Sequence, residues 1–148
     1  FQLSPIRLLT SVSAVINGGH SIVPHFGVSI ENTSNGSVRK LSYPQKKKIV
    51  SKETSENMKM ILESVVTEGS GAKTGTSEKL PRRSGKYIAS CIGFAPADDP
   101  KVLAVVLIDE PEGIYYGGTI AAPVVSELLD NALPYLGVKK TPQKQTKK

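Results

Sequence analysis

The sequence predicts an α/β fold of the α+β type, in which an antiparallel sheet is flanked by helices. Two apolar runs, residues 87–94 and 102–108, are long enough for strands. The short connection between them contains Asp98-Asp99-Pro100 and favours an antiparallel hairpin. The second run is almost wholly apolar, which is typical of a strand buried on both faces. At 148 residues, the chain is long enough for one domain with its own core.

Three helices are expected around these strands, each from an apolar stripe at helical spacing bounded by caps, prolines or glycines. They run from Ser4 to Asn17, from near Ser51 to Gly69, and from about Thr119 to Tyr135. Ser4 and Ser51 are the expected N-caps of the first two. Between these two helices, residues 20–31 are expected to be extended, and residues 37–43 to pair back as a hairpin strand.

The charge pattern separates the body of the chain from its end. The net charge is +6, and much of it lies in Lys46-Lys47-Lys48 and in residues 139–148. Such runs are typical of solvated segments, or of segments that attract anionic surfaces. We expect residues 139–148 to be a basic, disordered tail. Aromatic residues are only 5% and are not interleaved with basic ones, so a nucleic-acid partner is not expected.

Several kinds of site are excluded by what the sequence contains. A single cysteine, Cys91, allows no disulfide within the chain and no cysteine-based zinc site, and we expect a buried thiol. His20 and His25 have no acidic partner at ligand spacing, so no metal and no cofactor are expected. No apolar run is long enough for a membrane span. Because the chain begins with Phe1, we expect a fragment of a longer protein.

One tetrapeptide, Lys73-Thr74-Gly75-Thr76, brings a lysine, two hydroxyls and a glycine together. Lys-Thr-Gly is one of three signatures of penicillin-binding proteins and β-lactamases, and the others are Ser-x-x-Lys and Ser-Asp-Asn. Taken alone, the tetrapeptide also suits an ordinary turn. Its meaning therefore depends on the rest of the chain.

Five segments in order carry a family resemblance: residues 3–19, 60–69, 73–77, 87–97 and 109–123. Over residues 1–138 the chain resembles the C-terminal part of the transpeptidase domain of class B penicillin-binding proteins. These are septal, elongation or sporulation-specific peptidoglycan synthases. The resemblance implies part of the penicillin-binding and β-lactamase-like transpeptidase fold, with the tetrapeptide on a strand that edges the substrate cleft.

The resemblance also implies a role for each motif residue. Lys73 lends positive charge to the site and to the substrate carboxylate. Thr74 and Thr76 supply hydroxyl donors, and the backbone N–H of Thr76 matches an oxyanion-hole donor. Gly75 keeps the strand edge open to the peptide. Further residues that the resemblance places near the cleft are Ser77, Arg82, Arg83, Tyr115 and Tyr116, the two tyrosines mainly in a structural role.

The other two signatures are missing. Literal Ser-x-x-Lys strings occur at residues 37–40 and 70–73, and a Ser-x-Asn string occurs at residues 55–57. None stands upstream of Lys73 in the family's order and setting, so we interpret all three as chance matches. The nucleophilic serine of acyl transfer is therefore not expected in these residues, and the chain alone should be inactive. Only four residues separate Glu68 from Lys73, where the family resemblance implies a stretch of about a dozen.

The sequence thus predicts a fragment of a peptidoglycan DD-transpeptidase, whose parent binds the D-Ala-D-Ala stem peptide or a β-lactam. The parent is expected at the outer face of the bacterial cytoplasmic membrane, with cell-wall or division proteins as further partners. Two alternatives stay open: a fragment of a DD-carboxypeptidase or β-lactamase-type serine hydrolase, and a non-catalytic cell-wall binding module.

Two pairs of adjacent carboxylates, Asp98 with Asp99 and Asp109 with Glu110, also suggest acid catalysis. Neighbouring side chains of an extended segment point to opposite faces. Roles in turns and at strand ends are therefore the preferred interpretation.

Overall fold

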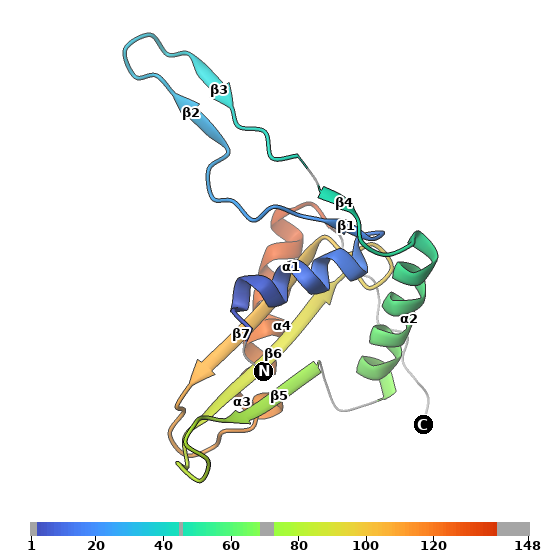
Figure 1. Cartoon of the computed structure of the whole chain (residues 1–148), viewed down its shortest axis with the longest axis vertical. Helices are drawn as coiled ribbons and strands as arrows, with labels where there is room; N and C mark the ends of the chain where they lie inside the picture. Colours follow the sequence, from blue (N-terminus) through green and yellow to red (C-terminus); the bar gives the residue numbers. More distant parts are fainter. Residues whose placement is uncertain (1–2, 45, 69–72, 139–148) are drawn as a thin grey trace. The chain divides into compact units, whose positions relative to one another are not determined.

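The computed structural model describes residues 3–44, 46–68 and 73–138, and of residues 46, 47, 63–68 and 73 the backbone alone. The chain divides into two compact units, Phe1–Lys59 and Met60–Lys148, which are described separately (Figure 1). The expected basic tail, the helix end at Gly69 and the segment just before Lys73 lie outside the described residues.

The first unit holds one complete helix and short strands. These are α1 (Pro5–Ile16), β1 (His20–Ser21), β2 (Ser29–Glu31), β3 (Val38–Lys40) and β4 (Lys46–Lys48). β2 and β3 form the expected hairpin, and β1 pairs with β4. A strand formed by the three consecutive lysines was not anticipated. Ser4 occupies the N-cap position of α1 but makes no side-chain capping bond, contrary to expectation, so Pro5 is the local signal that starts this helix.

Helix α2 (Lys52–Glu68) begins as the sequence predicts, and the unit boundary falls inside it. The backbone N–H of Thr54 donates to the Ser51 hydroxyl at 2.9 Å, which is an N-cap bond. One turn later, Ser55 is fully buried. Its hydroxyl donates to the Val15 carbonyl at 2.6 Å and accepts from the Gly18 N–H at 2.9 Å. Ser55 therefore fastens the start of α2 to the C-terminal end of α1.

The second unit contains a three-stranded antiparallel sheet in the order β5-β6-β7. Its strands are β5 (Lys73–Glu78), β6 (Tyr87–Ala95) and β7 (Val102–Asp109). β6 and β7 are the two strands that the apolar runs predict. The prediction that β7 is buried on both faces is wrong, because none of its residues is fully buried and Leu107 is 43% exposed. Among the described strands β7 forms an edge of this sheet, opposite β5.

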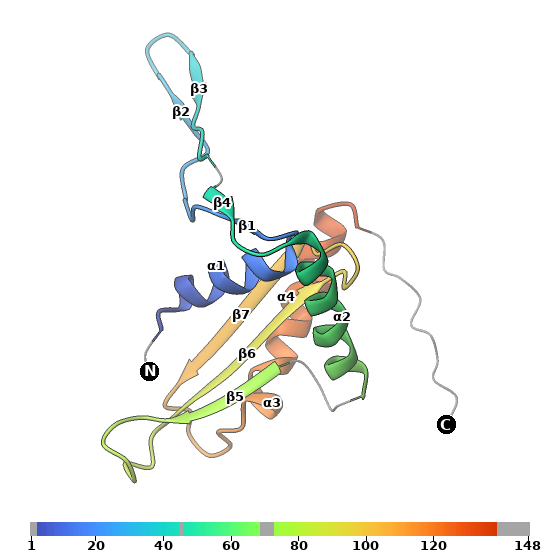
Figure 2. The same ribbon diagram turned by 45° about the vertical axis from the view of Figure 1, so that its right-hand side comes forward.

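Helices α3 (Gly117–Ile120) and α4 (Ala122–Tyr135) lie on one face of this sheet (Figure 2). They replace the single helix expected from Thr119. Cys91, Ala121 and Val125 are buried together between strand and helix, so the expected buried thiol is confirmed, and burial raises the pKa of Cys91. At Gly93, a Cβ would lie 2.8 Å from the Val125 side chain. The mixed fold with an antiparallel sheet is thus as predicted.

Within the part of the chain that the structure describes, no helix combines the length and the apolar character needed to cross a membrane.

Replacing Ser55 with alanine should destabilise the first unit. The Val15 carbonyl and the Gly18 N–H would lose a buried partner, and an unsatisfied buried group costs about 1–3 kcal/mol. The experiments proposed here use the protein translated from the complete reading frame, which we call the complete protein. In it, we expect the free energy of unfolding to fall by this amount. Chemical denaturation measures it. Ser29→Ala, at an exposed position in β2, is the control and should leave stability unchanged.

Candidate functional site

The tetrapeptide Lys73-Thr74-Gly75-Thr76 forms the start of β5, so it lies in a strand and not in a turn. β5 pairs with β6 on one side only, and its residues 74–78 are exposed. The motif therefore lies along an open edge of the sheet in the described part of the molecule. The structure describes Lys73 by its backbone, which is paired with Ile92.

Thr74 and Thr76 lie on the face of the sheet that α3 covers. In the register of the sheet they are paired with Cys91 and Ala89, both buried on that face. The backbone N–H of Gly117, at the start of α3, donates to the Thr76 hydroxyl at 3.2 Å. Because a hydroxyl has one proton and two lone pairs, this bond leaves the proton of Thr76 free for another acceptor.

Gly117 can reach Thr76 because it has no side chain. A Cβ at this position would lie 2.5 Å from the carbonyl oxygens of both Gly75 and Ser90, closer than real Cβ atoms come to backbone. The neighbouring Gly118 is less confined, since its Cβ would meet the Thr74 side chain at 3.5 Å. The two consecutive glycines therefore have different roles, and Gly117 sets how closely α3 approaches β5.

Gly75 is confined from the other face of the sheet. It is paired with Ser90, and a Cβ on Gly75 would lie 2.8 Å from the Ser90 hydroxyl oxygen. The Ser90 hydroxyl donates to the Gly75 carbonyl at 3.3 Å. The Ser90 hydroxyl therefore occupies the space beside Gly75 that a side chain would need, and it bonds to the backbone of the motif.

The remaining candidate residues divide into two groups. Ser77 continues the exposed edge of β5, and Arg82 and Arg83 are exposed in the turn that follows, where Arg83 has a φ of 68°.

Tyr115 stacks on Tyr87 with ring centroids 4.2 Å apart, and its centroid is 4.7 Å from that of Tyr116. A hydrogen bond with Tyr116 raises the pKa of Tyr115. The tyrosines thus fasten the loop before α3 to the beginning of β6.

Two of the three literal matches to Ser-x-x-Lys and Ser-x-Asn lie in places that do not suit a nucleophilic serine. Ser37 and Lys40 belong to the β2–β3 hairpin, and no helix starts there. Ser55 is buried, and its hydroxyl is already bonded to two backbone groups. Ser70 lies outside the described residues. Among those residues, no group of three or more His, Cys, Asp or Glu side chains is placed to hold a metal ion.

Two features of this region were not found from the sequence. The first is the contact of Gly117 with β5. Two features of the sequence could have indicated it: the pair of glycines after Tyr115-Tyr116, and the small Ser90 within an apolar strand. The second concerns Asp109 and Glu110. Their strand-end role is as expected, but their side chains do not point apart, because Glu110 has a φ of 49° and both carboxylates reach Lys79.

Comparison with known proteins identifies the family. The sequence model of the family described as penicillin binding protein transpeptidase domain matches residues 1–130. The chain belongs to this transpeptidase family. Relatives of this transpeptidase segment include stage V sporulation protein D of Bacillus subtilis, 41% identical over 93% of the chain and 24% of that protein. A probable peptidoglycan D,D-transpeptidase PenA of Neisseria meningitidis is 33% identical over 95% of the chain and 25% of its own length.

Solved structures agree with this assignment. PBPA from Mycobacterium tuberculosis superposes with a TM-score of 0.73 at 26% identity, over 88% of the chain and 32% of that structure. A peptidoglycan synthetase from Bifidobacterium adolescentis reaches 0.77 at 19% identity, over 97% and 28%, and shows the fold alone. The transpeptidase segment spans about a quarter of the curated relatives it matches.

Replacing Gly117 with alanine should displace α3 from β5. Overpacking against backbone that cannot rotate away costs about 1–3 kcal/mol, and we expect the free energy of unfolding of the complete protein to fall by that amount. Gly118→Ala is the matched control, because its Cβ would make an ordinary contact and should change stability by less than about 0.5 kcal/mol. Equal losses in the two variants would contradict the assigned role of Gly117.

Proposed function

We propose that this chain supplies the substrate-binding edge of a serine DD-transpeptidase that cross-links peptidoglycan. The observation that carries the proposal is the Thr76 hydroxyl, which lies on an open strand edge and accepts a bond from Gly117. That bond orients the oxygen and leaves its proton to be donated to a ligand. The family match and the relatives named as peptidoglycan D,D-transpeptidases support the same reaction.

The reaction is acyl transfer through a covalent serine intermediate. In this proposal the D-Ala-D-Ala end of a stem peptide, or a β-lactam in its place, lies along the exposed edge of β5. An extended peptide can add to such an edge by main-chain hydrogen bonds. Lys73 and the hydroxyls of Thr74 and Thr76 attract the terminal carboxylate. The backbone N–H of Thr76 stabilises the oxyanion of the tetrahedral intermediate.

The nucleophilic serine and its lysine belong, in this proposal, to a part of the protein outside these 148 residues. The chain covers only about a quarter of its relatives, which is consistent with that division. The missing part would also cover apolar side chains such as Leu107 of β7, which is 43% exposed. We place the whole enzyme at the outer face of the cytoplasmic membrane, where peptidoglycan is assembled.

Cross-linking joins the acylated stem peptide to a second one, the acceptor peptide. In this proposal Arg82 and Arg83 contact the acceptor peptide. Both are exposed in the turn that follows β5, and guanidinium groups pair well with carboxylates. We further propose that the exposed Ser77 and Tyr116 lie along the path of this peptide. The acceptor peptide therefore approaches from the β5–β6 turn.

Replacing Thr76 with valine tests the proposal. Valine keeps the volume of the side chain but removes the hydroxyl, and a hydrogen bond to a charged group contributes about 1.5–3 kcal/mol. We expect the second-order rate of acylation by a fluorescent penicillin to fall about tenfold to a hundredfold in the complete protein. Thr33→Val, in the exposed turn between β2 and β3, is the control and should be acylated at the wild-type rate.

Two further results decide between the proposal and its alternatives. The isolated 148 residues should not form a covalent adduct with penicillin, and an adduct on this chain would overturn the assignment of the nucleophile. With stem-peptide substrates, the complete protein should form cross-linked dimers. Release of D-alanine without dimers would show a carboxypeptidase, and no acylation at all would favour the wall-binding module.

A further inference from the structure

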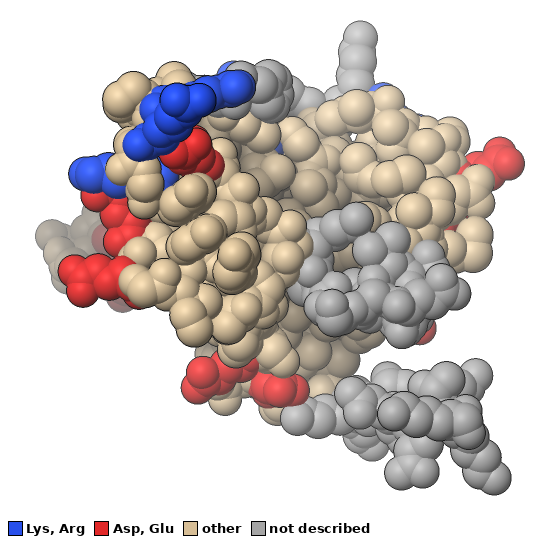
Figure 3. Space-filling model, turned by 90° about the horizontal axis from the view of Figure 1, so that it is seen from below, with Lys and Arg blue, Asp and Glu red and all other residues tan. Residues whose placement is uncertain are grey.

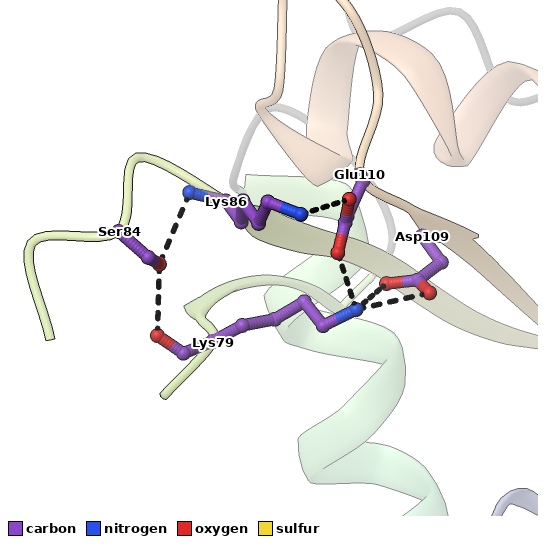
Figure 4. Close-up of polar contacts among 5 residues, drawn as sticks. All are labelled: Lys79, Ser84, Lys86, Asp109 and Glu110. Atoms are coloured by element: carbon purple, nitrogen blue, oxygen red, sulfur yellow. Dashed lines mark hydrogen bonds and ion pairs between the residues drawn. The ribbon is translucent and has the colours of Figure 1, made fainter. Parts of the chain in front are cut away.

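An ion-pair cluster closes the far end of the sheet in the second unit, beyond the motif strand (Figure 4). The Lys79 amine bonds to both carboxylate oxygens of Asp109, at 3.0 and 3.2 Å, and to Glu110 at 2.7 Å. The Lys86 amine bonds to the second oxygen of Glu110 at 2.9 Å. Two lysines and two carboxylates therefore form one connected group, which we call the end cluster.

The end cluster joins the ends of all three strands of this sheet. Lys79 directly follows β5, Lys86 directly precedes β6, and Asp109 ends β7. The intervening turn is fastened by backbone as well, because the Lys79 N–H donates to the Lys86 carbonyl at 2.8 Å. The Ser84 hydroxyl donates to the Lys79 carbonyl at 3.1 Å. The lysines are thus held at the base of a structured turn.

Glu110 has the unusual backbone that makes the cluster possible. Its φ of 49° lies in the left-handed region, which residues other than glycine adopt only at a cost. The Glu110 N–H donates to the Tyr87 carbonyl at 2.9 Å. In this conformation its two carboxylate oxygens reach Lys79 and Lys86 separately. The cluster therefore holds the beginning of the loop that leads to α3.

That loop returns to the motif strand. It is fastened at Glu110 by the end cluster and at Tyr115 by stacking on Tyr87. It ends at Gly117, whose N–H bonds to the Thr76 hydroxyl. Thr76 and Lys79 are three residues apart on the same segment. The end cluster and the Gly117 bond therefore close a ring of contacts around the C-terminal half of β5.

We propose that Lys79 and Glu110 are positioning residues, which hold β5 and the loop before α3 together so that the Thr76 hydroxyl faces its ligand. Neither residue touches substrate in this inference. It rests on the proposed function, because the ligand of Thr76 is the stem-peptide or β-lactam carboxylate.

The cluster is charged and reachable by solvent. Hydrogen bonds from Lys79 and Lys86 hold the pKa of Glu110 below its ordinary value, and bonds to Glu110 and Asp109 raise that of Lys79. Both shifts favour the charged forms of Glu110 and Lys79. On the surface seen in Figure 3, basic and acidic side chains lie side by side near one margin. Exposed ion pairs contribute little to stability, so their loss should leave the fold intact.

The test compares Lys79→Met, Lys79→Arg, Glu110→Gln and the double variant Lys79→Met/Glu110→Gln in the complete protein. Misplacing a catalytic geometry by about 1 Å can cost up to about a hundredfold in rate, and we expect acylation by fluorescent penicillin to fall about tenfold in Lys79→Met and in Glu110→Gln. The double variant should lose no more than either single one. Lys79→Arg should restore most of the rate, since it keeps the charge and the two-oxygen contact with Asp109.

Lys101→Met is the matched control. It removes another exposed ion pair, Lys101 with Asp99 at 2.6 Å, in the turn at the opposite end of β6 and β7. It should acylate at the wild-type rate, and the melting temperatures of all variants should match. Wild-type acylation in Lys79→Met, or an equal loss in Lys101→Met, would overturn the inference.

Amide hydrogen exchange supplies a readout that does not need the proposed function. In Lys79→Met and Glu110→Gln, exchange should rise in residues 73–78 and 110–118, but not in Lys101→Met. If the wild type is not acylated and exchange still rises there, the proposed function is wrong while the positioning of β5 stands. If exchange in these segments does not change, the end cluster does not position Thr76 and the inference is wrong.

Discussion

The contact of Gly117 with the backbone of Gly75 and Ser90 is the constraint on which the arrangement of the second unit depends. A Cβ at Gly117 would come within 2.5 Å of two carbonyl oxygens, so only glycine allows α3 to start at this distance from β5. Once it starts there, its first N–H reaches the Thr76 hydroxyl. The chain that follows then places Ala121 and Val125 against Cys91 in the core. A local property of one residue thus fixes both the position of a candidate substrate-binding hydroxyl and the packing of α4.

The motif strand itself has little apolar surface to hold it in place. Residues 74–78 are exposed, and β5 pairs with one neighbour only. An edge strand of this kind keeps its place through backbone pairing and through contacts at its ends. β5 has both, because it has a continuous register with β6, and α3 and the end cluster fasten its second half. An open edge can therefore coexist with a fixed geometry, which is what a binding strand requires.

The sequence predicted the elements with strong apolar patterns and missed the contacts between distant polar residues. β6, β7, α1, α2 and α4 followed from apolar runs, caps, prolines and glycines, because these signals are local. The strand β4, made of three lysines, did not, since a run of charged residues gives no strand pattern. The Thr76–Gly117 bond joins residues 41 positions apart, and no spacing rule reaches that far. The prediction that the side chains of Asp109 and Glu110 point to opposite faces was wrong, because the left-handed backbone of Glu110 ends the strand. Family resemblance marked β5 as important, but only the fold showed what holds it.

The two fastenings of β5 differ in their physics and so in the conditions that weaken them. The contact at Gly117 is steric and neutral, and dissolved salt does not screen it. The end cluster is made of exposed charges, and at an ionic strength of about 1 M the Debye length falls to about 3 Å. High salt should therefore lower acylation in the complete protein toward the rate of Lys79→Met, and have little further effect on that variant. The loss of stability expected in Gly117→Ala should stay the same at every salt concentration. If salt lowered acylation alike in the wild type and in Lys79→Met, the end cluster would not contribute separately to the position of Thr76.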